Sequence, residues 1–179
     1  MRNWAPIGFK TLVEPTYLGN LLQPTYMQFA NTALSEPEVG GLYVFVLMPF
    51  TREWSSNVWD FVNLACERLR EQYDDLAWER ADQMTDAGRI TDQIISAIER
   101  ADLVIAEVTE SNPNVMFELG YAAALGRPII LLDQAVEASP FDIKDWRQIV
   151  YSVDKLAEAR GELVRHLDAN VHRVRERRG

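Results

Sequence analysis

The sequence contains very little cysteine and histidine. Its 179 residues include one cysteine, Cys66, and two histidines, His166 and His172. One cysteine excludes an intrachain disulfide and a cysteine-based metal centre, and it favours a reducing compartment, most simply the cytoplasm. The histidines stand six positions apart on a predicted terminal helix, which is not the i,i+4 spacing of a one-face metal pair. We therefore expect neither a metal nor a cofactor.

Several other sequence features are missing. Neither G-x-G-x-x-G nor G-x-x-x-x-G-K-[ST] occurs, which argues against a Rossmann dinucleotide site and a Walker-type ATPase. No run approaches the roughly 20 apolar residues of a membrane span, and the amino terminus lacks the order of charges and apolar residues seen in signal peptides. These absences predict a soluble protein without a membrane partner.

Positive charge is also scarce, because the net charge is −9. We expect no nucleic-acid polymer as a partner, since such proteins usually present a basic surface. Seven of the 18 basic residues nevertheless lie from Lys155 onward. Their last members are interpreted as cations at a helix C-terminus followed by a basic tail at 175–179, rather than as a nucleic-acid arm.

The rest of the composition, 47% hydrophobic and 25% charged, is typical of one globular domain. Residues 1–41 have isolated aromatics and several prolines but no sustained period, so they are predicted to be an irregular arm. From Leu42 onward, short apolar runs alternate with helical patterns, and we place the α/β domain at 42–174. Strands are predicted at 42–48, 76–80, 103–108, 128–132 and 148–151. The pattern predicts a doubly wound, mostly parallel five-stranded sheet with helices on both faces, of the flavodoxin or Rossmann type.

Capping residues mark the predicted helix starts. The three starts are assigned to Ser55, Ser56 or Asn57, to Thr91 with Asp92 in its first turn, and to Asn112 followed by Pro113. Gly126 is predicted to end the third of these helices, which spans 113–125. The last helix is predicted at 154–174.

The most informative stretch is Asn112-Pro-Asn-Val-Met-Phe-Glu-Leu-Gly120, because it places Glu118 among apolar residues directly after a buried strand. Open α/β sheets bind their ligands at the carboxyl ends of the strands, where this helix begins. Glu118 is thus a candidate site residue. The alternative is an acid that interacts favourably with the helix dipole.

Further candidates follow the first three predicted strands. They are Pro49, Phe50 and Arg52 after the first strand, Asp92 before the third, and Asn112, Asn114 and Gly120 beside Glu118. Two carboxylates with amides and an aromatic ring suit a sugar joined to a flat heterocycle. Asp92, Arg52 and Asn112 each have a structural alternative as helix-start acid, solvated loop cation and N-cap.

Four ordered blocks then carry a resemblance: Val44-Phe-Val-Leu-Met-Pro-Phe50, Thr91-Asp-Gln-Ile94, Ala101-Asp-Leu-Val-Ile-Ala106 and Asn112 to Ala122. Over about 42–167 the chain resembles the nucleoside 2-deoxyribosyltransferase-like superfamily, and within it a TIR-like bacterial branch. The resemblance implies that Glu118 is the nucleophile that attacks the anomeric carbon. It also implies that Asp92, 26 positions earlier, handles the substrate sugar.

One position departs from the pattern of that family. Six residues before the nucleophile the transferases usually have an aspartate that protonates the base, whereas this chain has Asn112. An amide cannot supply a proton at neutral pH. The leaving group is then protonated from elsewhere, needs no proton, as with a cationic nicotinamide, or is bound without cleavage.

The predicted function is N-glycosidic cleavage or transfer on a nucleoside, nucleotide or NAD-like substrate. Phe50 would stack on the base and Arg52 would meet a 5′-phosphate. The alternative is a non-catalytic, self-associating TIR-like module that senses a nucleotide. Either function is expected in a homo-oligomer, because the aromatic residues of the arm seek burial and the enzymes that the chain resembles are oligomeric.

Overall fold

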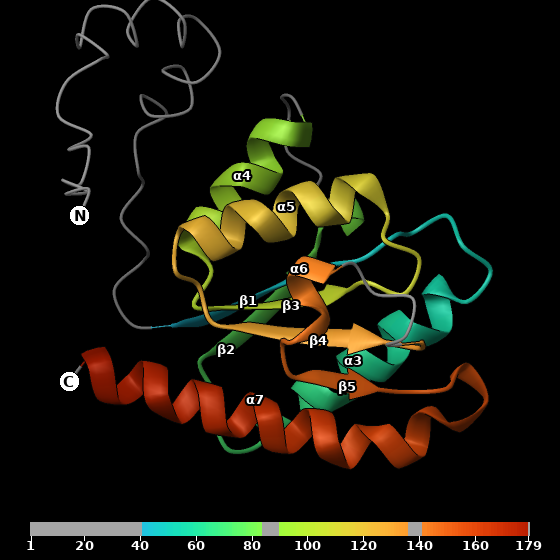
Figure 1. Ribbon diagram of the computed structural model, residues 1–179. Helices are drawn as coiled ribbons and strands as arrows, with labels where there is room; N and C mark the ends of the chain where they lie inside the picture. The colour runs from blue at the N-terminus through green and yellow to red at the C-terminus, as the bar shows by residue number, and fades with distance from the viewer. Residues whose placement is uncertain (1–40, 84–89, 136–140, 179) are drawn as a thin grey trace, which may run out of the picture. The chain divides into compact units, whose positions relative to one another are not determined.

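A computed structural model describes residues 41–83, 90–135 and 141–178 (Figure 1). The predicted arm at 1–41 lies outside the described residues except for Gly41. The described elements follow one another along the chain, beginning with four strands and three helices. They are β1 (Leu42–Leu47), α3 (Ser55–Arg70), β2 (Leu76–Arg80), α4 (Ile90–Arg100), β3 (Leu103–Glu107), α5 (Pro113–Ala124) and β4 (Ile129–Asp133). The chain continues through α6 (Phe141–Lys144), β5 (Gln148–Val150) and α7 (Leu156–Arg178), with single 3-10 turns at Ala81–Gln83 and Val153–Lys155.

The five strands form one parallel sheet in the order β2-β1-β3-β4-β5, which confirms the predicted α/β class. The chain moves from β1 outward to β2 and then returns to add β3 on the other side of β1. Such an order creates a switch point at the carboxyl ends of β1 and β3, where the loops leave in opposite directions. A ligand site is therefore expected at that edge.

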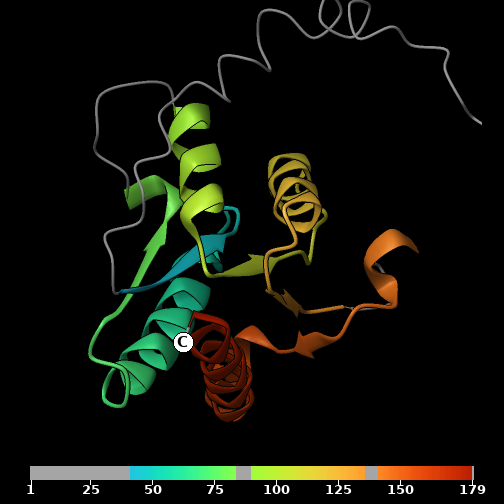
Figure 2. The ribbon, with the colours of Figure 1, turned by 90° about the vertical axis from the view of Figure 1, so that its left-hand side faces the viewer.

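Helices cover both faces of the sheet: α4 and α5 lie on one face, and α3 and α7 lie side by side on the other (Figures 1 and 2). The β1 side chains alternate accordingly. Val44 and Val46 pack in the core beneath α3 and α7, whereas Phe45 and Leu47 pack beneath α4 and α5. Burial on both faces explains why β1 is an unbroken apolar run.

Two of the predicted caps are wrong. The N-cap of α3 is Trp54, which makes no side-chain cap, and Ser55 is the first helical residue. The Ser55 hydroxyl is buried and is used by the preceding loop instead: it donates to the carbonyl oxygen of Pro49 at 2.5 Å and accepts from the amide of Arg52 at 3.2 Å. Helix α4 begins at Ile90, so Thr91 is its second residue, although Asp92 does lie in the first turn.

The predicted start and end of α5 are confirmed. The side chain of Asn112 accepts from the amides of Asn114 and Val115, at 3.0 and 3.4 Å, and Pro113 opens the helix. After the helix, Gly126 has a φ of 68°, and the amides of Gly126 and Arg127 bond to the last-turn carbonyls in a Schellman arrangement.

Helix α7 extends beyond its predicted end at Val174 and includes residues 175–178. Its last turn is held by ion pairs from Arg175 to Asp75 and from Arg178 to Asp102. Part of the terminal positive charge therefore fastens α7 to the amino-terminal edge of the sheet. None of the helices in the described ranges is long and apolar enough to cross a membrane.

Candidate active site

A cleft of about 610 Å³ opens at the carboxyl ends of β1, β2 and β3, at the switch point of the sheet. Segments from three parts of the chain contribute to it: the loop after β1, the turn after β2 together with α4, and the start of α5. Within the described ranges its lining consists of Met48, Pro49, Phe50, Thr51, Ala81, Asp82, Ile90, Thr91, Ile94, Ile95, Asn112, Asn114, Val115, Phe117 and Glu118.

Glu118 projects into this cleft from the second turn of α5. In the described part of the chain, no hydrogen bond or ion pair reaches its carboxylate. Burial without a compensating partner raises the pKa of Glu118 from 4.5 to about 7. Near neutral pH this carboxylate is thus divided between its protonated and ionised forms, and no cation of the described residues pairs with the ionised form.

A second acid of the lining, Asp82, differs from Glu118 because it forms an ion pair. Its two carboxylate oxygens accept from Nε and Nη2 of Arg80, at 2.5 and 2.6 Å. The Arg80 guanidinium also lies over the ring of Trp59, 4.9 Å from the centroid. Glu118 is consequently the one acid lining the described cleft that lacks a basic partner there.

Apolar groups dominate the mouth of the cleft. Phe50, Ile90 and Phe117 come from three different segments and are 55%, 67% and 65% exposed. Exposed aromatic side chains in a cleft offer flat faces to a heterocyclic ring. Pro49, in contrast, is buried, and its carbonyl is held by Ser55.

Asn112 and Asn114 both line the cleft beside Glu118. The capping bonds engage Oδ1 of Asn112, so the cap predicted for it is observed. The amide NH₂ group of Asn112 remains as a hydrogen-bond donor, which can hold a base or a sugar oxygen but cannot protonate either.

Three predicted site residues are not among the described residues that line the cleft. Asp92 lies beside it in the first turn of α4, between the lining residues Thr91 and Ile94. Arg52 forms an ion pair with Glu110, with 2.6 Å between Nη2 and Oε2, which links the β1–α3 loop to the β3–α5 loop. Gly120 is exposed on α5.

Sequence reasoning missed two features of this edge of the sheet. Phe117 and Ile90 line the cleft, and only their apolar character beside Glu118 and Thr91 marks them in the sequence. Glu107 lies in a strand, as predicted, but it is also a buried acid in an apolar run, the same signal that singles out Glu118.

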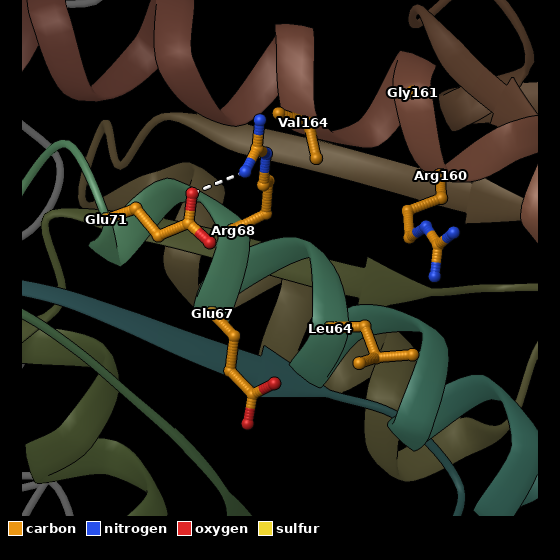
Figure 3. Close-up of a pocket in the computed structure, with 7 residues that line it drawn as sticks. All are labelled: Leu64, Glu67, Arg68, Glu71, Arg160, Gly161 and Val164. Atoms are coloured by element: carbon orange, nitrogen blue, oxygen red, sulfur yellow. Dashed lines mark hydrogen bonds and ion pairs between the residues drawn. The ribbon is translucent and has the colours of Figure 1, made fainter.

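A second hollow lies between α3 and α7 (Figure 3). Its walls are Leu64, Glu67, Arg68 and Glu71 of α3 and Arg160, Gly161 and Val164 of α7, and Arg68 forms an ion pair with Glu71. None of the predicted site residues lies there. The cleft at the switch point is therefore the stronger candidate for an active site.

Comparisons with known proteins agree with the expected family. The model of the nucleoside 2-deoxyribosyltransferase family matches residues 44–166, more than half of the chain. A 5-hydroxymethyl-dUMP N-hydrolase of Rattus norvegicus is 46% identical over 43 residues, which are 24% of this chain and 26% of that protein. The match thus spans only about a quarter of this relative's length.

Solved structures of similar proteins include a CMP N-glycosidase of Clostridium botulinum, with 24% identity, a TM-score of 0.49, and coverage of 68% of this chain and 97% of that one. A 2-deoxyribosyltransferase of Bacillus psychrosaccharolyticus has 17% identity and a TM-score of 0.43, with 66% and 90% covered. The fold assignment rests on the sheet order and on the family match. On that match, the chain belongs to the nucleoside 2-deoxyribosyltransferase family.

Proposed function

We propose that this protein cleaves or transfers the N-glycosidic bond of a nucleoside, nucleotide or NAD-like substrate, with Glu118 as the nucleophile. One observation carries the proposal: in a chain of this family, a carboxylate that has no partner among the described residues and a pKa raised to about 7 lines the cleft at the switch point. Both the position and the chemistry of Glu118 suit a nucleophile, because a covalent mechanism needs an accessible carboxylate without a competing cation.

In the proposed reaction, one oxygen of ionised Glu118 attacks the anomeric carbon of the sugar while the carbon–nitrogen bond to the base breaks. The base leaves with the bonding electron pair, and a glycosyl ester forms on Glu118. Water or a second base then attacks the same carbon and releases Glu118. Water as the acceptor gives hydrolysis, and a second base gives transfer.

The remaining groups are assigned by their places around the cleft. Phe50 stacks on the base above Pro49, while Asn112 and Asn114 donate or accept hydrogen bonds at the start of α5. Asp92 orients the sugar hydroxyls or assists proton transfer from the first turn of α4. This role needs the sugar to approach the edge of the cleft formed by that turn.

The proposed phosphate contact of Arg52 and the contact of Gly120 have less support. Arg52 is half exposed and already paired with Glu110, so a substrate phosphate would have to compete with that carboxylate. Gly120 would need a substrate that extends along the exposed side of α5. Both residues are therefore secondary targets for mutation.

The test is a panel of deoxyadenosine, deoxycytidine, CMP, dUMP and NAD, with released base measured by chromatography. Monophosphates are included because the curated relative is named for a nucleotide substrate. Release of base that is lost in Glu118→Gln supports the proposal. Tight binding of a compound without release from any of the five contradicts it and favours the nucleotide-sensing alternative.

We also propose that the protein is a homo-oligomer whose neighbouring copy closes the cleft. The three exposed apolar side chains at the mouth, Phe50, Ile90 and Phe117, are the reason, because clustered exposed apolar groups mark contact surfaces. Light scattering of the full chain is expected to give a multiple of its 20.5 kDa mass. A monomeric mass at micromolar concentration contradicts this proposal.

A further inference from the structure

The loop between β3 and α5 is anchored at its base by a buried acid. Glu107 is the last residue of β3 and is 1% exposed. Its Oε1 accepts hydrogen bonds from the amide of Thr109 at 3.3 Å, from the Thr109 hydroxyl, and from the Tyr151 hydroxyl at 2.9 Å. A single carboxylate oxygen thus collects three donors from the following loop and from the end of β5.

The network continues beyond these donors. Gln134, after β4, donates from its amide to the Thr109 hydroxyl at 3.0 Å and from Nε2 to the Tyr151 hydroxyl at 3.1 Å. The ring of Tyr151 stacks on Phe61 of α3, with 5.9 Å between the centroids. All of these hydrogen bonds point toward Glu107 as the final acceptor, so its carboxyl group joins the ends of β3, β4 and β5.

The loop itself leaves little room for independent movement. Only Glu110 and Ser111 separate Thr109 from the helix cap Asn112. Glu110 is paired with Arg52, and Ser111 has a φ of 49°, in the left-handed region that non-glycine residues rarely adopt. Because the connection is short and constrained, the position of Thr109 sets where α5 begins, and hence where Glu118 lies.

We propose that Glu107 is a positioning residue: without touching the substrate, it holds the β3–α5 loop so that Asn112 and Glu118 face the cleft in their working geometry. The inference rests on the function proposed above. It extends that function by assigning a role to an acid that is not among the described lining residues. Small misplacements of a nucleophile lower the rate much more than they lower substrate binding.

The role requires an acceptor oxygen rather than a negative charge. Burial raises the pKa of the Glu107 carboxyl, against the lowering effect of the hydrogen bonds from Thr109 and Tyr151. Glu107→Gln keeps an oxygen that can accept from these donors. Glu107→Leu has a similar size and accepts from none of them.

Hydrogen–deuterium exchange of the full-length protein tests the anchoring. The control is Leu167→Ala, a cavity variant in the α7 core that is remote from the loop. In Glu107→Leu, the amides of Asn114, Val115 and Met116 are expected to exchange at least about tenfold faster than in Leu167→Ala, and Glu107→Gln is expected to match the parent. Equal exchange in Glu107→Leu and Leu167→Ala, or equally fast exchange in the Gln and Leu variants, overturns the proposal.

Should Glu107→Leu fail to fold, Tyr151→Phe gives the same test with a milder change. It removes one donor and keeps the ring that stacks on Phe61. Faster exchange at Asn114 to Met116 than in Leu167→Ala is expected, and exchange no faster than in that control overturns the proposal.

The kinetic part uses whichever compound of the five-member panel the parent cleaves fastest. Glu107→Leu is expected to lower kcat by about tenfold with KM changed by less than about threefold, while Glu107→Gln restores kcat. A folded Glu107→Leu variant with the kcat of the parent overturns the positioning role. A parent that releases no base contradicts the proposed function, and the exchange measurement then still decides whether Glu107 anchors the loop.

Discussion

Glu107 and Glu118 lie eleven positions apart, the first at the end of β3 and the second in the second turn of α5. Both are acids in apolar surroundings. Glu107 is more deeply buried and accepts three hydrogen bonds through one oxygen. Glu118 is less buried, lines the cleft and has no partner in the described part of the chain. The comparison indicates that the partners of an acid in apolar surroundings, rather than its burial alone, separate Glu107, which accepts hydrogen bonds, from Glu118, the proposed nucleophile.

The strongest test of this comparison is Glu118→Gln. The amide keeps the shape of the side chain but lacks the negative charge, so we expect kcat to fall by on the order of a thousandfold or more, with an unchanged circular dichroism spectrum. Glu158→Gln, which changes an exposed acid of α7, serves as the control and should retain the rate of the parent. Undiminished turnover in Glu118→Gln would remove Glu118 from the mechanism.

The pH dependence of kcat/KM is the next largest effect. In the proposed mechanism only ionised Glu118 attacks, and burial raises its pKa to about 7, so kcat/KM is expected to rise about tenfold per pH unit below 7 and to level off above it. Steady-state rates across this range check the expectation. A half-maximum near 4.5, the ordinary value for this group, would show that the cleft does not perturb Glu118.

Replacing each of the two acids by leucine should change the free energy of unfolding differently. Glu107→Leu leaves the donors of partly buried Thr109 and of buried Tyr151 without this acceptor, so it is expected to destabilise the fold by about 2 kcal/mol. Glu118→Leu removes a partly buried acid that has no partner in the described part of the chain, so it should be neutral, or stabilising by up to about 1 kcal/mol, at a pH above 7. Urea denaturation of both variants measures the difference, and losses of equal size would erase the distinction.

The pH dependence of the free energy of unfolding gives a further test of Glu118. The pKa of Glu118 is higher in the folded protein than its ordinary 4.5, so the folded state binds a proton more tightly than the unfolded chain. The resulting stability is fully present below 4.5 and is lost as the pH rises through about 7. After allowance for solvent screening we expect a change on the order of 1 kcal/mol, which Glu118→Gln should abolish.

Local patterns in the sequence were sufficient for the strands and the longer helices, and for part of the cleft. The apolar run of β1 and the Asn112-Pro113 start of α5 are local features, and both are found where they were predicted. Once alternating strands and helices imply a parallel sheet, Phe50, Asn112 and Glu118 must follow strands that end at one edge. Their meeting in one cleft is therefore predictable without coordinates.

The errors arise where a side chain finds a partner outside its own segment. Ser55 has the composition of a cap, but its hydroxyl bonds to the Pro49 carbonyl, six residues away. Arg52 looks free in the sequence because Glu110 lies on another loop. Glu107 is a strand residue, as predicted, but its part as an acceptor is not visible in the sequence because Tyr151, its donor, is 44 positions further along the chain. Such pairings depend on how segments that are distant in the sequence are placed beside one another, and a local sequence pattern does not contain this information.

The smallest expected effect concerns Asn112→Asp, which would introduce the acid that the family usually has at this position. An aspartate can accept the same two amide hydrogens, so the cap and the fold should persist. Those donors and the helix dipole stabilise the ionised carboxylate, which limits its strength as a proton donor. Release of adenine from deoxyadenosine is therefore expected to speed up by only about threefold to tenfold. Release of nicotinamide from NAD, which departs neutral without a proton, should be unchanged, and an equal acceleration of both would show that residue 112 acts only through binding or capping.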